Sequence, residues 1–106
     1  MSNPKRTAKR FPMQLPVTVK YSNGGVHADS GRTENVSFGG IYFETSAKLM
    51  AGDKVELVLP VPAALCADGN GWVRCWAKVV WVESRQNGIM GVGAAVETYE
   101  VMPSQA

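Results

Sequence analysis

The sequence contains few of the residues from which metal sites, disulfide frameworks and many catalytic centres are built. Its 106 residues include two cysteines, Cys66 and Cys75, and one histidine, His27. Two cysteines cannot form a disulfide framework, and with a lone histidine they do not supply the usual four ligands of a structural zinc site. The composition therefore predicts no metal centre and favours a reducing, cytoplasmic location.

Long apolar runs are also missing. No stretch reaches the roughly 18 to 20 apolar residues of a membrane-spanning helix. The first ten residues, MSNPKRTAKR, carry positive charge, but the apolar segment of a secretory signal does not follow them. We therefore expect neither a membrane span nor secretion.

Catalytic motifs are sparse as well. His27 stands beside Asp29 in a polar segment, and nothing in the sequence indicates a nucleophile that converges on it, so we expect a solvent-exposed histidine. The pair Gly39-Gly40 lacks the following Lys-Ser/Thr of a P-loop. The sequence predicts no catalytic residues and a protein that is not an enzyme.

Positive charge is concentrated at the N-terminus, where Lys5, Arg6, Lys9 and Arg10 are accompanied by no acidic residue. The remaining 96 residues carry seven basic and nine acidic groups. A basic arm on a mildly acidic body is typical of a protein that binds a polyanion, such as nucleic acid, a nucleotide or an anionic membrane. A solubilising, disordered terminus would have the same charge pattern.

The rest of the chain alternates between apolar and polar residues, with turns rich in glycine, proline and asparagine at spacings of about ten residues. The segments that we expect to be strands are residues 14–21, 26–36, 41–45, 54–61, 72–83 and 89–96. Short strands joined by short turns, with almost no helix, predict an all-β antiparallel barrel or sandwich.

The alternation also predicts which side chains form the apolar faces of these strands. They are Val17, Val19, Tyr21, Ile41, Phe43, Val55, Leu57, Leu59, Val73, Cys75, Ala77, Val79, Trp81, Met90, Val92, Ala94 and Val96. Trp76 falls on the opposite face of its strand with Arg74 and Lys78, which makes it the tryptophan we expect to be available for stacking.

Two short motifs change the interpretation when they are taken together. The first is Arg6-Thr7-Ala8-Lys9-Arg10, and the second is Asn35-Val36-Ser37-Phe38-Gly39-Gly40. Their order, separation and strand context resemble the PilZ domain, the bacterial receptor module for cyclic di-GMP. The signature of that family is RxxxR followed about twenty to thirty residues later by D/N-x-S-x-x-G. The flanking segments 77–81 and 88–93 are similar too, so the resemblance covers residues 5–97.

The resemblance implies a fold and domain boundaries. The expected fold is a six-stranded antiparallel β-barrel of the PilZ-like, split-barrel type, in a single domain over residues 1–106. A mobile basic arm that binds the ligand would occupy residues 1–12, the barrel residues 13–97, and a tail with little or no C-terminal helix residues 98–106.

The resemblance also implies which residues bind cyclic di-GMP. Arg6 and Arg10 would pair with phosphate or with the guanine O6/N7 edge, because the planar fork of arginine matches both. Asn35 would accept from guanine N1–H and N2–H, more weakly than an aspartate. Ser37 would bond phosphate or base, and Gly40 would allow close backbone approach and unusual φ values. Further candidates are Lys5, Lys9, Gly39 and Trp76.

Several alternatives remain open at this stage. Asn35 and Ser37 also suit a turn capped by their own side chains. Members of the family bind one ligand or a stacked pair, and the residue before RxxxR, here Lys5, influences which. The expected function is a cyclic di-GMP receptor, without a cofactor, that switches an unidentified protein partner. The other candidates are an adaptor on the same fold without the ligand and, less favoured because the body is acidic, a barrel that binds single-stranded nucleic acid.

Overall fold

The segments with alternating apolar and polar residues do form strands. The computed structural model describes residues 14–22, 24–37, 39–60 and 71–102. Its strands are β1 (Pro16–Ser22), β2 (Val26–Val36), β3 (Gly40–Thr45), β4 (Lys54–Pro60), β5 (Trp72–Ser84) and β6 (Met90–Met102). A short 3-10 turn over Gln86–Gly88 joins the last two. Within these described ranges, no helix is long and apolar enough to cross a membrane.

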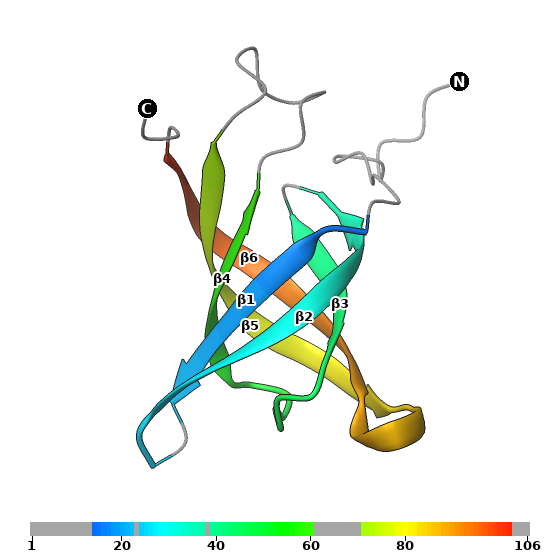
Figure 1. Cartoon of the computed structure of the whole chain (residues 1–106). Helices are drawn as coiled ribbons and strands as arrows, with labels where there is room; N and C mark the ends of the chain where they lie inside the picture. The colour runs from blue at the N-terminus through cyan, green and yellow to red at the C-terminus, as the bar shows by residue number, and fades with distance from the viewer. Residues whose placement is uncertain (1–13, 23, 38, 61–70, 103–106) are drawn as a thin grey trace, which may run out of the picture.

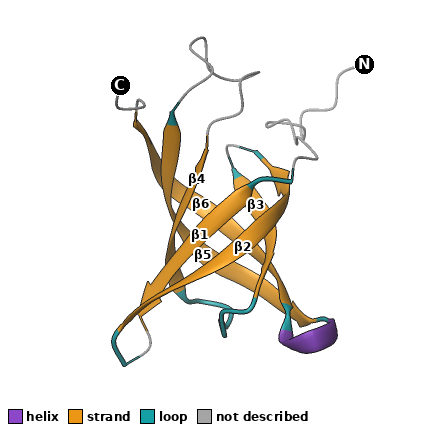
Figure 2. Ribbon diagram, viewed as in Figure 1, coloured by secondary structure: helices purple, strands orange, loops and turns teal. Residues whose placement is uncertain are grey.

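The strands close into a barrel in the order β1-β2-β3-β6-β5-β4, and all neighbours are antiparallel (Figures 1 and 2). Strands that follow each other in the chain are paired, except β3 and β4. Instead, β3 pairs with β6, and β4 pairs with β1 to close the barrel. The long β5–β6 pair forms one wall of the barrel. The expected all-β barrel is confirmed.

The core lies inside the barrel and contains most of the residues that the alternation predicted. Its fully or nearly fully buried members include Val19, Ile41, Phe43, Leu57 and Val92. Tyr21, Val36, Val73, Met90 and Val96 are partly buried and pack against them. Burying apolar surface of this kind contributes about 25 cal/mol per Å², so the inward alternation is the main stabilising pattern of the chain.

Trp81 is the exception, since the prediction that it faces inward is wrong. The register between β5 and β6 shifts between Val79 and Trp81, which leaves Val80 as an extra residue. Beyond this bulge, Val82 lies opposite the buried Val92 and packs against the core. Trp81 therefore takes the outer face. A bulge inverts the alternation of the residues after it, and the sequence pattern alone does not mark its position.

The last strand is also longer than expected. Residues 98–106 were expected to form a tail, but β6 continues to Met102 and pairs with β5 as far as Trp72. The register shifts again between Trp76 and Ala77, opposite Glu97. The alternation therefore skips one position after Val96, and this shift hid the continuation of the strand.

Candidate functional site

The turn between β2 and β3 is organised by the side chain of Ser37. Its Oγ accepts from the backbone N–H of Gly40 at 3.1 Å and of Gly39 at 3.3 Å, and it donates to the carbonyl of Gly40 at 3.1 Å. The backbone N–H of Ser37 also donates to that carbonyl. Ser37 thus caps the turn, one of the two roles considered for it, and holds the backbone of both glycines in place.

The glycines bring this turn against β6. The carbonyl of Gly39 accepts from the N–H of Val96 at 3.2 Å. A Cβ on Gly40 would lie 3.3 Å from the carbonyl oxygen of Ala94, which is tighter than ordinary contact. Gly40 is not among the glycines with positive φ, so the expectation of an unusual φ is wrong; its close approach is to β6, and its expected approach to a ligand stays a prediction.

A β-bulge decides where Asn35 lies. Thr33 is opposite Phe43 and Asn35 is opposite Tyr42, so Glu34 is an extra residue in β2. Thr33 and Phe43 are both fully buried, which places Tyr42 and its partner Asn35 on the outer face of the barrel. In a regular strand Asn35 would share the inward face of Thr33. The bulge therefore turns the Asn35 amide outward, where it can meet a ligand.

The N-terminal arm joins the barrel at the same place. Leu15 donates its N–H to Oγ1 of Thr33 at 2.8 Å, and its carbonyl accepts from the N–H of Thr33 at 2.9 Å. Figure 1 shows the start of β1 beside the end of β2. Arg10 precedes Leu15 by five positions in the chain and lies outside the described residues.

Sequence reasoning missed an aromatic pair on the same outer face. Tyr42, Gly93 and Trp81 lie side by side across β3, β6 and β5. A Cβ on Gly93 would be 2.3 Å from Nε1 of Trp81, so the indole lies across the bare backbone of Gly93. The rings of Tyr42 and Trp81 meet edge to face at 5.4 Å. The bulge before Trp81 concealed this pair from the sequence pattern.

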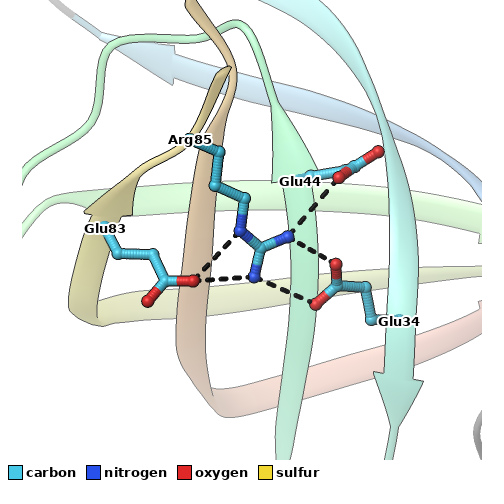
Figure 3. A network of polar contacts seen from close by, with 4 residues as sticks. All are labelled: Glu34, Glu44, Glu83 and Arg85. Carbon is cyan, nitrogen blue, oxygen red and sulfur yellow. Dashed lines mark hydrogen bonds and ion pairs between the residues drawn. The ribbon is translucent and has the colours of Figure 1, made fainter.

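A polar network adjoins the pair (Figure 3). The guanidinium of Arg85 contacts Glu34 through Nη1 and Nη2, Glu83 through Nε and Nη2, and Glu44 through Nη1 at 3.4 Å. A Cβ on Gly91 would lie 2.6 Å from this group, so the guanidinium rests on β6 at a residue without a side chain. Hydrogen bonds to Glu34 and then to Glu83 raise the pKa of Arg85, which stays charged.

Other expected residues are placed differently or lie outside the described part. Arg6, Arg10, Lys5 and Lys9 fall outside the described residues. Trp76 is on the outer face as expected, with Arg74 at 5.9 Å from its ring. It lines a surface pocket of about 400 Å³ with residues of β1, β4 and β6 and with Val26 at the start of β2. None of the described residues of the β2–β3 turn lines that pocket, so the structure does not join Trp76 to Asn35 there.

The residues considered for catalysis and metal binding are ordinary in their surroundings. His27 is exposed and stacks on Tyr21 with ring centroids 5.3 Å apart. Tyr21 donates to Asp29 at 2.6 Å, and this bond raises the pKa of the Tyr21 hydroxyl. Cys75 is a buried free thiol, while Cys66 lies outside the described residues. In the part of the chain that the structure describes, no group of three His, Cys, Asp or Glu residues is arranged to hold a metal ion.

Comparison with known families accounts for this arrangement. A family model described as the PilZ domain matches residues 4–102. The chain belongs to the PilZ domain family. PilZ domains are generally receptors for cyclic di-GMP, and they act typically as ligand-binding or adaptor domains without enzymatic activity. A comparison with curated proteins found no match.

Solved structures show the same fold at low sequence identity. The inhibitor of motility MotI/DgrA of Bacillus subtilis matches 94% of this PilZ chain at 14% identity, with a TM-score of 0.72. This chain spans 45% of the length of that protein. The PilZ domain of CeSA from a cellulose-synthesizing bacterium matches 82% of this chain and 79% of its own at 24% identity, with a TM-score of 0.52.

Proposed function

We propose that this PilZ protein is a cyclic di-GMP receptor that binds its ligand on the outer face of the barrel, between the N-terminal arm and the β2–β3 turn. The observation that carries the proposal is the position of Asn35. The β2 bulge turns this residue outward, two positions from Thr33, where the arm joins the barrel at Leu15. This placement supports a site in which the two halves of the sequence signature meet at one end of the same strand pair.

Each part of the proposed site supplies a different interaction. Asn35 accepts from the N1–H and N2–H donors of guanine. Arg6 and Arg10 bind phosphate oxygens or the O6/N7 edge of the base. Ser37 and the glycines 39 and 40 present a turn held against β6, with Lys5 and Lys9 adding positive charge.

The aromatic pair extends the proposal beyond the signature. Tyr42 lies next to Asn35, and Trp81 lies across Gly93 from Tyr42, on the same face. A purine bound by Asn35 would lie over this pair, where stacking on an aromatic ring contributes about 1 to 3 kcal/mol per base. The sequence candidate Trp76 is replaced in this role by Trp81.

The arm is proposed to supply most of the positive charge for the two phosphates. On the described outer face beside Asn35, the carboxylates of Glu34, Glu44 and Glu83 surround the guanidinium of Arg85, and the exposed Arg32 is paired in register with Glu44. This surplus of negative charge disfavours a dianionic ligand unless Arg6 and Arg10 join the site. Binding is therefore proposed to bring the arm onto the turn and so to change the surface offered to a protein partner. Equal amide exchange at residues 3–12 with and without ligand would contradict this switch.

Calorimetric titration with cyclic di-GMP tests the proposal. The wild type is expected to bind saturably, with a stoichiometry that separates one ligand from a stacked pair. Arg10→Ala is expected to weaken binding by about 10- to 100-fold, because a hydrogen bond from a charged group contributes roughly 1.5 to 3 kcal/mol. Asn35→Ala should weaken binding less, since its bond is uncharged.

The result also separates the receptor from the other functions considered for this fold. A folded wild type that takes up no cyclic di-GMP would exclude the receptor and leave the nucleic-acid-binding barrel or an adaptor, whose partner binding Arg10→Ala would not change. The proposal assigns the protein to the cytoplasm, where a free thiol such as Cys75 stays reduced. The proposed role is to bind cyclic di-GMP, without catalysing a reaction.

A further inference from the structure

Arg85 connects three strands at the point where β2 bulges. Its guanidinium holds both carboxylate oxygens of Glu34, through Nη1 and Nη2. Glu34 is the extra residue of the bulge and directly precedes Asn35. The contacts to Glu83 and Glu44 anchor the same guanidinium to β5 and β3 (Figure 3). A residue of the β5–β6 turn region, far away in sequence, thus grips the residue beside the proposed ligand acceptor.

The bulge has a competing arrangement, and the Arg85 contact favours one of the two. A bulge leaves its extra residue without a partner in the ladder, so the bulge itself gains little from backbone pairing. Without it, Asn35 would turn inward and Val36 outward, although Val36 now packs against the core. A two-pronged ion pair fixes the Glu34 side chain in direction as well as in distance, which a single contact does not.

We propose that Arg85 is a positioning residue for the ligand site: through Glu34 it holds the β2 bulge that keeps the Asn35 amide aimed outward beside Tyr42. The predicted effect of Arg85 on ligand binding rests on the proposed function. The predicted effect of Arg85 on the position of Asn35 does not, because it can be measured in the ligand-free protein. Besides the arm and the turn, affinity would then depend on a third part of the chain, the residue that follows β5. That residue would not touch the ligand itself.

Charge and geometry make different predictions here. If Arg85 served only to offset nearby carboxylates, any cation at this place would suffice. If it acts through the fork that holds Glu34, a lysine keeps the charge but loses the two-pronged bond. Gly91→Ala gives a second, independent change, because its Cβ would fall 2.6 Å from the guanidinium and displace that flexible group while every charge stays.

The experiment compares Arg85→Lys and Gly91→Ala with the wild type by two measurements. In the free protein, the nuclear Overhauser effect between the Asn35 side-chain amide and the Tyr42 ring reports the position of Asn35, with Asn35→Asp used to assign the signal. We expect both variants to weaken this effect by half or more. In calorimetry, both are expected to raise the Kd for cyclic di-GMP about three- to tenfold, at low and high salt alike, as expected for geometry rather than for screened charge.

Arg74→Lys is the matched control. Arg74 is another outer-face arginine, within β5, with Nε 3.2 Å from Glu56 of β4 and further contacts to Glu100 and to the Trp76 ring. It should leave both the Asn35 signal and the Kd unchanged. A Glu34→Gln, Arg85→Lys double variant should bind no more weakly than the worse single variant, because both changes break one interaction.

The outcomes separate this inference from the function on which it rests. An Asn35 signal that is the same in wild type, Arg85→Lys and Gly91→Ala would overturn the positioning role whether or not the ligand binds. Loss of the signal in both variants, in a protein that takes up no cyclic di-GMP, would support the positioning role and exclude the receptor. If the Asn35–Tyr42 Overhauser effect weakens in the variants while the Kd stays constant, the importance of Arg85 for affinity would be overturned.

Discussion

Cys75 shows how a single buried position acquires a pH dependence that its neighbours lack. The side chain points into the barrel from β5, opposite Leu57 of β4, and is 4% exposed. Burial disfavours the thiolate and raises the pKa of the Cys75 thiol from 9.0 to about 11. The thiol is therefore neutral and chemically inert at neutral pH, and behaves as a small apolar residue.

This shift predicts a loss of stability in base. Between pH 9 and about pH 11 the unfolded chain releases the thiol proton while the folded chain retains it, so the free energy of unfolding falls as the pH rises. Each pKa unit corresponds to about 1.4 kcal/mol, which gives a decrease of roughly 2 to 3 kcal/mol. Urea unfolding of the wild type and of Cys75→Ala at both pH values measures this decrease in the free energy of unfolding. An equal decrease in the two proteins would contradict the prediction.

At the scale of the elements, glycines bring the strands closer than side chains allow. Gly31 of β2 lies between β1 and β3, and a Cβ there would be 2.5 Å from the backbone carbonyl of Glu44. Gly91 and Gly93 of β6 leave room for Arg85 and Trp81 on the outer face. The two types of site differ, since a flexible side chain can move away from a new Cβ and a strand backbone cannot.

Gly31→Ala is therefore expected to destabilise the barrel. The new methyl group has to displace the backbone of β3, and overpacking of this kind costs about 1 to 3 kcal/mol. That cost exceeds the stabilisation of roughly 0.4 to 1 kcal/mol that alanine brings by restricting the unfolded chain. Thermal or urea unfolding measures the change, with the exposed neighbour Ser30→Ala as a control that should stay within about 0.5 kcal/mol. A Gly31→Ala variant as stable as the wild type would contradict the close approach.

Over the whole molecule, charge separates the arm from the barrel. Around Trp76, two outer-face cations are paired, Arg74 with Glu56 and Lys54 with Glu97, at 3.2 and 2.8 Å, while Lys78 lies exposed on the same face opposite Lys54. A groove for single-stranded nucleic acid needs cations that are free to follow a backbone of phosphates. On the wall that sequence analysis considered for stacking, the cations Lys20, Lys54 and Arg74 are thus already engaged by carboxylates, which favours a small anionic ligand bound by the arm.

The change in Tm on adding ligand tests whether the arm binds a small anionic ligand or the barrel binds nucleic acid. Cyclic di-GMP at about 100 times its Kd should stabilise the folded protein by roughly 2.7 kcal/mol, and Tm should rise by about 10 °C. Arg10→Ala at the same ligand concentration should show a smaller rise in Tm, of about 2 to 5 °C, because its Kd is expected to be 10- to 100-fold higher. An oligothymidylate should leave Tm unchanged even at low salt, and a rise that disappears with added salt would instead indicate a nucleic-acid-binding barrel.

The sequence by itself determined the six strands, most of their inward faces, the two motifs and the basic arm, because each of these follows from local alternation or spacing. Only the tertiary structure decided the register. Bulges at Glu34, Val80 and Glu97 shift the faces of everything beyond them. A bulge is set by the pairing between strands and by contacts such as that of Arg85 with Glu34, 51 residues apart. For that reason the outward position of Asn35, the place of Trp81 and the length of β6 followed from the assembled barrel and not from the pattern along the chain.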